Sequence, residues 1–191
     1  MDATIGRDFP EKHLEDLKYF LYDAQQQGYG GTERRGKRLG CEVMPDGGTK
    51  QTFETGVIEQ TFADGSTKII WENGGFRYSD KFFGGEPFGG MTVVRFEGKA
   101  CFVMVYHGLV FPGVEKELAY GCLQKALMEV DKDFPVRGPS LFKTEVSGIR
   151  LKYTRVLNGS DISQFNGKET ITTPDRNVYE AYFAGGLVNL R

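Results

Sequence analysis

The feature that most constrains the fold of this chain is a pattern of aromatic residues and glycines that occurs twice. The pattern reads F-x-G-x(3)-[VI]-x(7)-[FY]-x(3)-[YF]-x-G, and it begins at Phe88 in the first copy and at Phe165 in the second. Glycine permits tight turns, whereas aromatic and β-branched residues favour strands. The pattern therefore predicts a structural repeat built mainly from short antiparallel strands.

We expect each repeat to consist of a helix followed by a three-stranded meander. Because one helix cannot cover the whole apolar face of a meander, the two halves should pack against each other. The predicted fold class is α+β, with the two pseudo-repeated units forming a curved antiparallel sheet that carries the helices on one face. An N-terminal hairpin would be inserted in the first unit, and a groove would form where the halves meet.

The length and composition agree with a single domain of this kind. The chain has 191 residues, of which 26 are Gly, 15 Phe and 9 Tyr, and this glycine content is well above the usual ~7%. We predict one domain over residues 1–191, with pseudo-repeat halves at about 10–110 and 114–190 and an insert at about 29–72.

The spacing of hydrophobic residues and of turn residues predicts where the individual helices, strands and loops lie. Leucines at three- and four-residue steps predict a helix over residues 10–28, and a second apolar stripe predicts a helix over 114–130. The Gly-rich segment 29–52 is predicted to be a loop, and Asp64-Gly65 suits the turn of a hairpin. The predicted strands lie at 53–62, 67–72, 75–82, 91–97, 100–107, 144–157, 168–173 and 177–184, with a short tail at 187–190.

Charge and cysteine content restrict the function. The formal net charge of −2 disfavours nucleic-acid binding by the whole surface. The locally basic segment 31–38 is predicted to be a solvated loop or, alternatively, an anion-binding or partner-binding patch. The three cysteines lack metal-site spacing and are predicted to be small buried side chains. Because no export signal or long apolar stretch is evident, we expect a soluble cytoplasmic protein. We predict no metal site, in line with the cysteine spacing, and no other cofactor.

The segment Phe82–Gly90 is the most unusual part of the sequence. It combines three phenylalanines with glycines and one carboxylate, a composition that can hold a planar or cationic ligand through stacking and charge. We therefore predict a small-molecule-binding or effector-sensing module that holds a partly aromatic or cationic ligand in the groove. The candidate ligand-binding residues are Tyr78, Asp80, Phe82, Phe83, Glu86, Phe88, Tyr106, His107 and Arg137.

Two alternatives remain open. The first is a small hydrolase or isomerase that uses carboxylate, Tyr or His acid-base chemistry, with His107, Asp80 and Glu86 as the groups to test. Such chemistry needs only two well-placed titrating groups, but the sequence contains no recognised catalytic motif. The second alternative is a protein-interaction adaptor or a homodimer that pairs through an exposed strand edge.

Several ordered motifs also resemble a known family. They are GFRYSDKFFGGEPFGG, EGKACFVMVYHGLV, PVRGP, FNGKETI and VYEAYFAGGLV, in that order along the chain. Together they are similar to the bacterial domain of unknown function 5680 family, whose members occur alone or behind helix-turn-helix domains, and the resemblance extends from about Leu14 to Leu190. The family tends to show a Glu two residues after the F-x-G element, where this chain has Thr92 in the first copy and Glu169 in the second. The resemblance implies an effector or partner-binding role and no known reaction.

Overall fold

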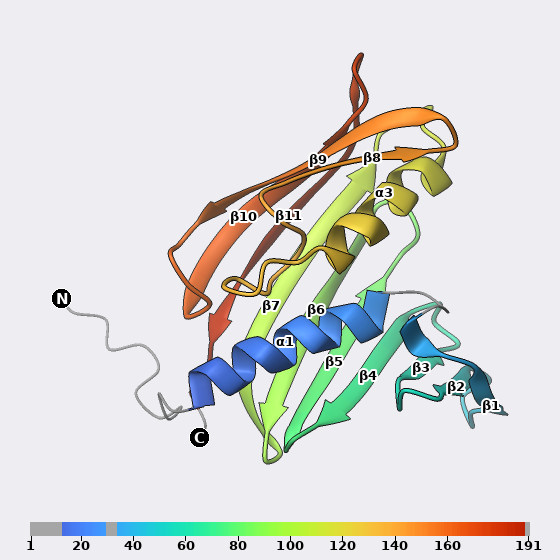
Figure 1. Cartoon of the computed structure of the whole chain (residues 1–191). Helices are drawn as coiled ribbons and strands as arrows, with labels where there is room; N and C mark the ends of the chain where they lie inside the picture. The colour runs from blue at the N-terminus through green and yellow to red at the C-terminus, as the bar shows by residue number, and fades with distance from the viewer. Residues whose placement is uncertain (1–12, 30–33, 190–191) are drawn as a thin grey trace.

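The computed structural model describes residues 13–29 and 34–189, and these residues fold around one antiparallel sheet of eleven strands (Figure 1). Two long helices accompany the sheet, α1 (Leu14–Tyr29) and α3 (Lys116–Met128). The strands, in chain order, are β1 (Arg38–Val43), β2 (Thr49–Phe53), β3 (Ile58–Thr61), β4 (Thr67–Asn73), β5 (Phe76–Phe83), β6 (Phe88–Phe96), β7 (Lys99–Val110), β8 (Leu141–Val146), β9 (Ile149–Asn158), β10 (Gln164–Thr172) and β11 (Asn177–Leu187).

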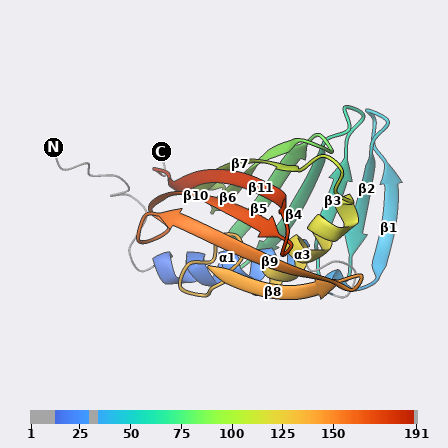
Figure 2. The same cartoon turned by 90° about the horizontal axis from the view of Figure 1, so that it is seen from above.

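The order of the strands shows how the two parts of the chain join in one sheet. Strands β1 to β7 are neighbours in sequence and in the sheet, whereas the second half enters at the far edge, so that the order is β1-β2-β3-β4-β5-β6-β7-β11-β10-β9-β8. The two parts join where β7 pairs with β11, with Tyr106 opposite Phe183. Seen from above, the sheet curls around both helices (Figure 2).

This architecture corrects the predicted α+β fold of two helix-plus-meander repeats, which is wrong. Seven strands follow α1 and four follow α3, and all eleven belong to one continuous antiparallel sheet. The recurring pattern marks two similar hairpins instead: Phe88 pairs with Gly108 between β6 and β7, and Phe165 pairs with Gly185 between β10 and β11. Local patterns specify a hairpin because its strands are close in sequence, but they do not specify how distant strands join.

Helix α1 forms because its apolar residues recur on one face, and that face packs against β4 and β5. Leu17 and Leu21 are buried, and the Phe20 ring stacks on Trp71 and on Phe76 with centroids 5.1 Å apart in each case. Helix α3 buries its own apolar stripe against β8, β9 and β10. The core therefore consists of two hydrophobic clusters, one that contains the buried residues of α1 and one that contains those of α3. Phe88 packs against both clusters.

Several predicted boundaries shift in the structure. The helices match their predictions closely, although residues 10–12 of the first lie outside the described residues. The predicted loop at 29–52 contains β1 and most of β2. All residues of β1 are exposed and those of β2 are mostly half-buried, so neither strand shows the alternation of buried and exposed residues that marks a strand. The predicted strand 144–157 is a hairpin of β8 and β9, turned by Ser147 and Gly148, which both have positive φ.

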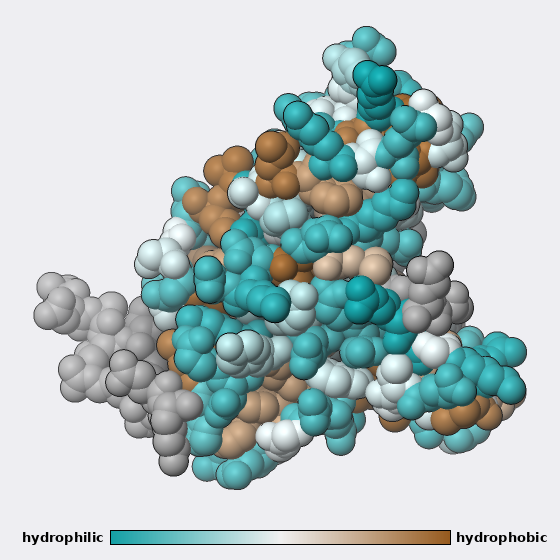
Figure 3. All heavy atoms as spheres, in the orientation of Figure 1, coloured by the Kyte–Doolittle hydropathy of each residue, from teal (hydrophilic) through white to brown (hydrophobic). Residues whose placement is uncertain are grey.

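Hydrophilic residues cover much of the face shown in Figure 3, with hydrophobic patches between them.

Two of the three cysteines have the predicted burial. Cys101 and Cys122 are buried as predicted, but Cys41 is exposed, so its prediction as a buried side chain is wrong. Among residues 13–29 and 34–189, neither helix is long and apolar enough to cross a membrane.

Candidate functional site

A cavity of about 350 Å³ lies where the β5–β6 loop, β7 and α3 come together. This volume is within the range of about 300 to 1,000 Å³ that is typical of small-molecule sites. Its walls are mainly aromatic and aliphatic, and they consist of Tyr29, Phe82, Gly84, Gly85, Phe88, Tyr106, Tyr120, Leu123, Gln124, Leu127 and Arg137. We refer to this space as the aromatic cavity.

Glycines shape the wall formed by β6 and the β5–β6 loop. A Cβ atom on Gly90 would lie 2.5 Å from the Tyr106 hydroxyl oxygen, so only glycine leaves room for that ring to cross β6. Gly84 has φ +78, and a Cβ there would lie 2.6 Å from the carbonyl oxygen of Pro87. Both positions therefore require glycine for the observed backbone and ring placement.

Behind the aromatic wall lies the fully buried carboxylate of Asp80. It accepts hydrogen bonds from the Tyr29 hydroxyl at 2.6 Å, from the Thr92 hydroxyl at 3.0 Å and from the Tyr106 hydroxyl at 3.0 Å. Burial raises the pKa of Asp80 above its usual value. The hydrogen bonds from the three hydroxyls lower this pKa, but their effect is smaller than that of burial. Desolvation and then the charge of Asp80 also raise the pKa of Tyr106, so this phenol stays protonated and acts as a donor.

A second buried carboxylate, Glu169, lies on β10 and forms an ion pair with Arg137. Arg137 Nε donates to Glu169 at 3.1 Å, and Arg137 Nη2 donates to the other carboxylate oxygen. Tyr153 and Tyr179 each donate a hydroxyl hydrogen bond to Glu169 at 2.7 Å. Desolvation, followed by the charge of Glu169, holds the pKa of both tyrosines well above their ordinary value.

Arg137 connects the Glu169 carboxylate with the cavity. Its guanidinium carbon lies 5.5 Å from the centroid of the Tyr106 ring, and the same side chain lines the aromatic cavity. Nε and Nη2 bind Glu169, whereas Nη1 makes no hydrogen bond to any of residues 13–29 and 34–189. This nitrogen can donate to a ligand in the cavity.

The segment that carries Arg137 is held from two sides. The Gln25 side chain of α1 donates to the carbonyl of Pro135 at 2.9 Å, and Arg155 of β9 donates to the carbonyl of Val136 at 2.5 Å. Arg137 itself has φ 63, a conformation that a non-glycine residue rarely adopts. These contacts position the guanidinium before any ligand is present.

A family model for a domain of unknown function, DUF5680, matches residues 80–188, which is more than half of the chain. The chain belongs to the DUF5680 family. The matched region begins at Asp80 and includes the β5–β6 loop, Arg137 and Glu169, so most of the DUF5680 cavity lies within it. No curated protein and no solved structure matches the chain.

The DUF5680 structure brings together five of the nine candidate residues predicted from the sequence. Phe82, Phe88, Tyr106 and Arg137 line the aromatic cavity, and Asp80 lies directly behind Tyr106.

The other four do not line the aromatic cavity. Tyr78 is buried beside Tyr29 and Thr92 in the centre around Asp80, and the half-exposed Phe83 ring contacts the Lys81 ammonium. The Glu86 carboxylate accepts hydrogen bonds from the backbone N–H of Val110 and from the Tyr120 hydroxyl. His107 is exposed and lines a separate shallow groove with Tyr182 of β11.

Sequence reasoning missed several residues of this DUF5680 site. Tyr29 comes from the end of α1, and Tyr120 comes from α3, so neither is near the predicted Phe82–Gly90 segment in sequence. The sequence pattern identifies Glu169 only as the counterpart of Thr92. The signal that would have found it is its inward position on β10, because a carboxylate on a buried face requires partners.

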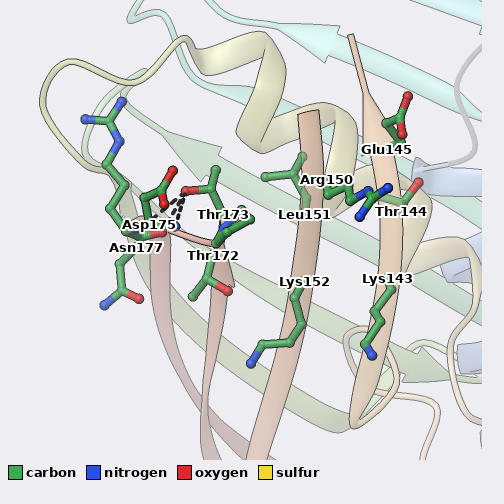
Figure 4. A pocket seen from close by; sticks show the side chains of 12 residues that line it. Lys143, Thr144, Glu145, Arg150, Leu151, Lys152, Thr172, Thr173, Asp175 and Asn177 are labelled. Atoms are coloured by element: carbon green, nitrogen blue, oxygen red, sulfur yellow. Dashed lines mark hydrogen bonds between the residues drawn. The ribbon is translucent and has the colours of Figure 1, made fainter. Parts of the chain in front are cut away.

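A larger hollow lies on the outer side of β8 and β9, near the turn between β10 and β11 (Figure 4). It has a volume of about 820 Å³ and is lined by charged and polar side chains, among them Lys143, Lys152 and Asp175. Figure 4 shows Lys143 and Lys152 side by side, and both are exposed to solvent. Since none of the described residues that line this hollow is both polar and buried, we consider the aromatic cavity the stronger DUF5680 site.

Among the described residues, no group of three or more His, Cys, Asp and Glu side chains is arranged to hold a metal ion. The polar groups in the wall of the cavity in this DUF5680 chain are phenols, the Gln124 side chain, one guanidinium and backbone groups.

Proposed function

We propose that this DUF5680 domain is a small-molecule-binding or effector-sensing module whose ligand occupies the aromatic cavity. The observation that carries the proposal is the combination of an apolar cavity with a buried, preoriented guanidinium in its wall. Arg137 is the only charged side chain in that wall among the described residues.

The placement of the charges narrows the ligand class. Glu86 does not line the cavity. Its carboxylate accepts hydrogen bonds from the Val110 N–H and the Tyr120 hydroxyl. A cationic ligand would therefore meet Arg137 without a compensating carboxylate in the wall. The cavity favours a small aromatic or aliphatic molecule with a carbonyl or carboxylate group that accepts a hydrogen bond from Arg137.

Phe82 and Phe88 would contact the apolar part of such a ligand. The Phe88 ring lies 6.2 Å from the Tyr120 ring and 6.3 Å from the Tyr106 ring, so these rings form one continuous wall. Offset or edge contacts with a ligand ring would add to the burial of apolar surface.

A thermal-shift screen with a panel of small aromatic and aliphatic carboxylic acids, together with their primary amides, tests the proposal. A binder stabilises the fold by RT ln(1 + [L]/Kd), so the melting temperature should rise with its concentration. Leu123→Trp places an indole in the cavity and should abolish this rise. Lys116→Trp adds the same ring at an exposed position of α3 and serves as the control.

Two results would overturn the proposal. The first is a panel in which no compound raises the melting temperature of the unsubstituted chain. The second is a rise that persists unchanged in Leu123→Trp, because that ligand would be bound outside the aromatic cavity.

A further inference from the structure

A second cavity, with a volume of about 690 Å³, adjoins the aromatic cavity. Tyr29, Phe82 and Gln124 line both spaces, so the two cavities meet at these three residues. We refer to the second space as the arginine cavity, because Arg35 and Arg38 belong to its wall.

The register of the sheet shows that the floors of the two cavities belong to one face. Gln51 lies opposite Glu59, Glu59 lies opposite Ile69, and all three line the arginine cavity. Ile69 in turn lies opposite Asp80, whose carboxyl lies behind the aromatic cavity. Side chains directly opposite each other in neighbouring strands point to the same face, so this row is continuous from β2 to β5. A ligand that lies along the row would occupy both cavities.

Arg35 is held in the wall by contacts within the protein. Its Nη1 donates to the Glu59 carboxylate at 2.6 Å, and its Nη2 donates to the carbonyl of Gly28 near the end of α1. Its guanidinium carbon lies 5.5 Å from the centroid of the Phe53 ring. The charge of Arg35 is therefore balanced by Glu59, and two of its nitrogens are already engaged.

Arg38 has no such partners. It pairs with Phe53 across β1 and β2, so its side chain lies on the same face of the sheet as that buried ring. Arg38 is exposed and forms no ion pair within the described part of the chain. The carboxylate that the described residues contribute to this wall belongs to Glu59, which binds Arg35. The arginine cavity thus offers one uncompensated positive charge to a ligand.

We propose that the two cavities together bind one elongated ligand that has an apolar body and an acidic group at each end. One acidic group accepts a hydrogen bond from Arg137, which lines the aromatic cavity but not the arginine cavity. The other accepts from Arg38, which lines the arginine cavity but not the aromatic cavity. Phe82 lines both and contacts the apolar body. A carboxylate or a phosphate suits each end, because a guanidinium binds both.

This proposal rests on the proposed function, since the first acidic group occupies the aromatic cavity. It also narrows the predicted anion-binding patch in the basic segment 31–38 to one side chain. Residues 31–33 lie outside the described residues, and Arg34 is exposed and lines neither cavity. Arg38 is then the residue of this segment that binds the ligand.

Isothermal titration calorimetry with pairs of acids of equal length tests the proposal. Each pair consists of a straight-chain monocarboxylic acid and the α,ω-dicarboxylic acid with the same number of carbon atoms, both kept below the concentrations at which micelles form. At the length that reaches both arginines, the dicarboxylic acid should bind about tenfold more tightly or better, because it gains a charged hydrogen bond to Arg38. Shorter pairs should show no such advantage.

A matched pair of variants assigns this advantage to Arg38. Arg38→Gln should lower the affinity for the dicarboxylic acid to that for the monocarboxylic acid, and it should leave the latter unchanged. Arg34→Gln removes the same charge from a nearby exposed position and should keep the advantage. An advantage that survives in Arg38→Gln, or an equal loss of affinity for both acids, would overturn the proposal.

A charge exchange gives a second test. Arg38→Glu should reverse the preference between the dicarboxylic acid and the ω-amino carboxylic acid of the same length, because the introduced carboxylate attracts the terminal ammonium group and repels a carboxylate. The same preference in Arg38→Glu and in the unsubstituted chain would contradict the placement of the second acidic group.

The outcomes distinguish this proposal from the function on which it rests. Suppose that a monocarboxylic acid binds and that Leu123→Trp abolishes its binding, but that no dicarboxylic acid binds more tightly than the monocarboxylic acid of its length. The aromatic cavity is then a ligand site, and the elongated ligand is refuted. If no acid of any pair binds the unsubstituted chain, both proposals are overturned.

Discussion

The two buried carboxylates of the sheet have similar partners but different charges around them. Each accepts hydrogen bonds from two tyrosine hydroxyls, which belong to Tyr29 and Tyr106 for Asp80 and to Tyr153 and Tyr179 for Glu169. The third partner of Glu169 is the guanidinium of Arg137, whereas the third partner of Asp80 is the neutral hydroxyl of Thr92. The same protein thus holds one carboxylate in an ion pair and the other without a cation in hydrogen-bond contact.

In the proposed function, the two centres have separate roles. Glu169 fixes the orientation of Arg137, so the guanidinium is in place for a ligand. The Asp80 carboxyl lies behind a tyrosine that lines the cavity, and its hydrogen bonds can respond to what occupies that space. We regard the Glu169 centre as a support of the site and the Asp80 centre as its adjustable part.

The largest effect should follow from separating the ion pair. Arg137→Met leaves Glu169 buried without its cation, and it should lower the free energy of unfolding by about 3 to 5 kcal/mol. Urea denaturation measures this change. Adding Glu169→Gln to Arg137→Met should recover part of the loss, and a double variant that is less stable than Arg137→Met would show that the pair is not coupled in this way.

A smaller effect is expected from filling the space beneath Tyr106. Gly90→Ala places a methyl group against the Tyr106 hydroxyl and the Lys81 carbonyl, and it should cost about 1 to 3 kcal/mol of unfolding free energy by overpacking. Gly85→Ala is the matched control in the same region, because a Cβ there meets no atom within 4 Å. Equal stability of the two variants in urea denaturation would refute the close packing of Tyr106 on Gly90.

The tyrosines that bind Glu169 and those that bind Asp80 should differ in their contribution to the free energy of unfolding. Tyr179→Phe removes a hydrogen bond to a carboxylate in an ion pair and should cost about 1.5 to 3 kcal/mol. Tyr106→Phe should cost about 0.5 to 1.5 kcal/mol at mildly acidic pH, where the raised pKa keeps Asp80 more protonated. A larger cost for Tyr106→Phe than for Tyr179→Phe in chemical denaturation would reverse the proposed distinction.

The pH dependence of Asp80→Asn should give the smallest but most specific effect. Since burial raises the folded pKa of Asp80 above the ordinary value of 3.8, the fold favours the protonated carboxyl. The stabilisation that the protonated Asp80 carboxyl contributes to the fold is fully present when the pH is below this ordinary value. It is lost as the pH rises through the pKa of Asp80 in the folded protein. Asn does not titrate, so the stability of the variant relative to the unsubstituted chain should increase with pH. A relative stability that stays constant or decreases would contradict the pKa direction.

Local patterns predicted the parts of the fold that depend on neighbouring residues. The period of apolar residues located both helices, and Asp64-Gly65 predicted the turn between β3 and β4, where Gly65 has φ 80. The sheet order could not be predicted in the same way. It depends on the pairing of β7 with β11, which joins residues such as Tyr106 and Phe183 that are distant in sequence.

The same limit applies to the candidate site. The Phe82–Gly90 segment predicted an aromatic wall because its composition is unusual over a few residues. Tyr29 could not be linked with Asp80, because their contact depends on how α1 lies on β5. His107 lies apart from the cavity because alternation along β7 directs it outward while Tyr106 points inward.

The most direct test of the contrast between the two carboxylates is a ¹³C NMR titration of the Asp80 side-chain carboxyl, assigned by comparison with Asp80→Asn. The account predicts a midpoint above 3.8. It also predicts that a carboxylic acid bound in the aromatic cavity will shift this resonance through Tyr106. A midpoint at or below 3.8, together with a resonance that does not respond to a bound ligand, would contradict the account.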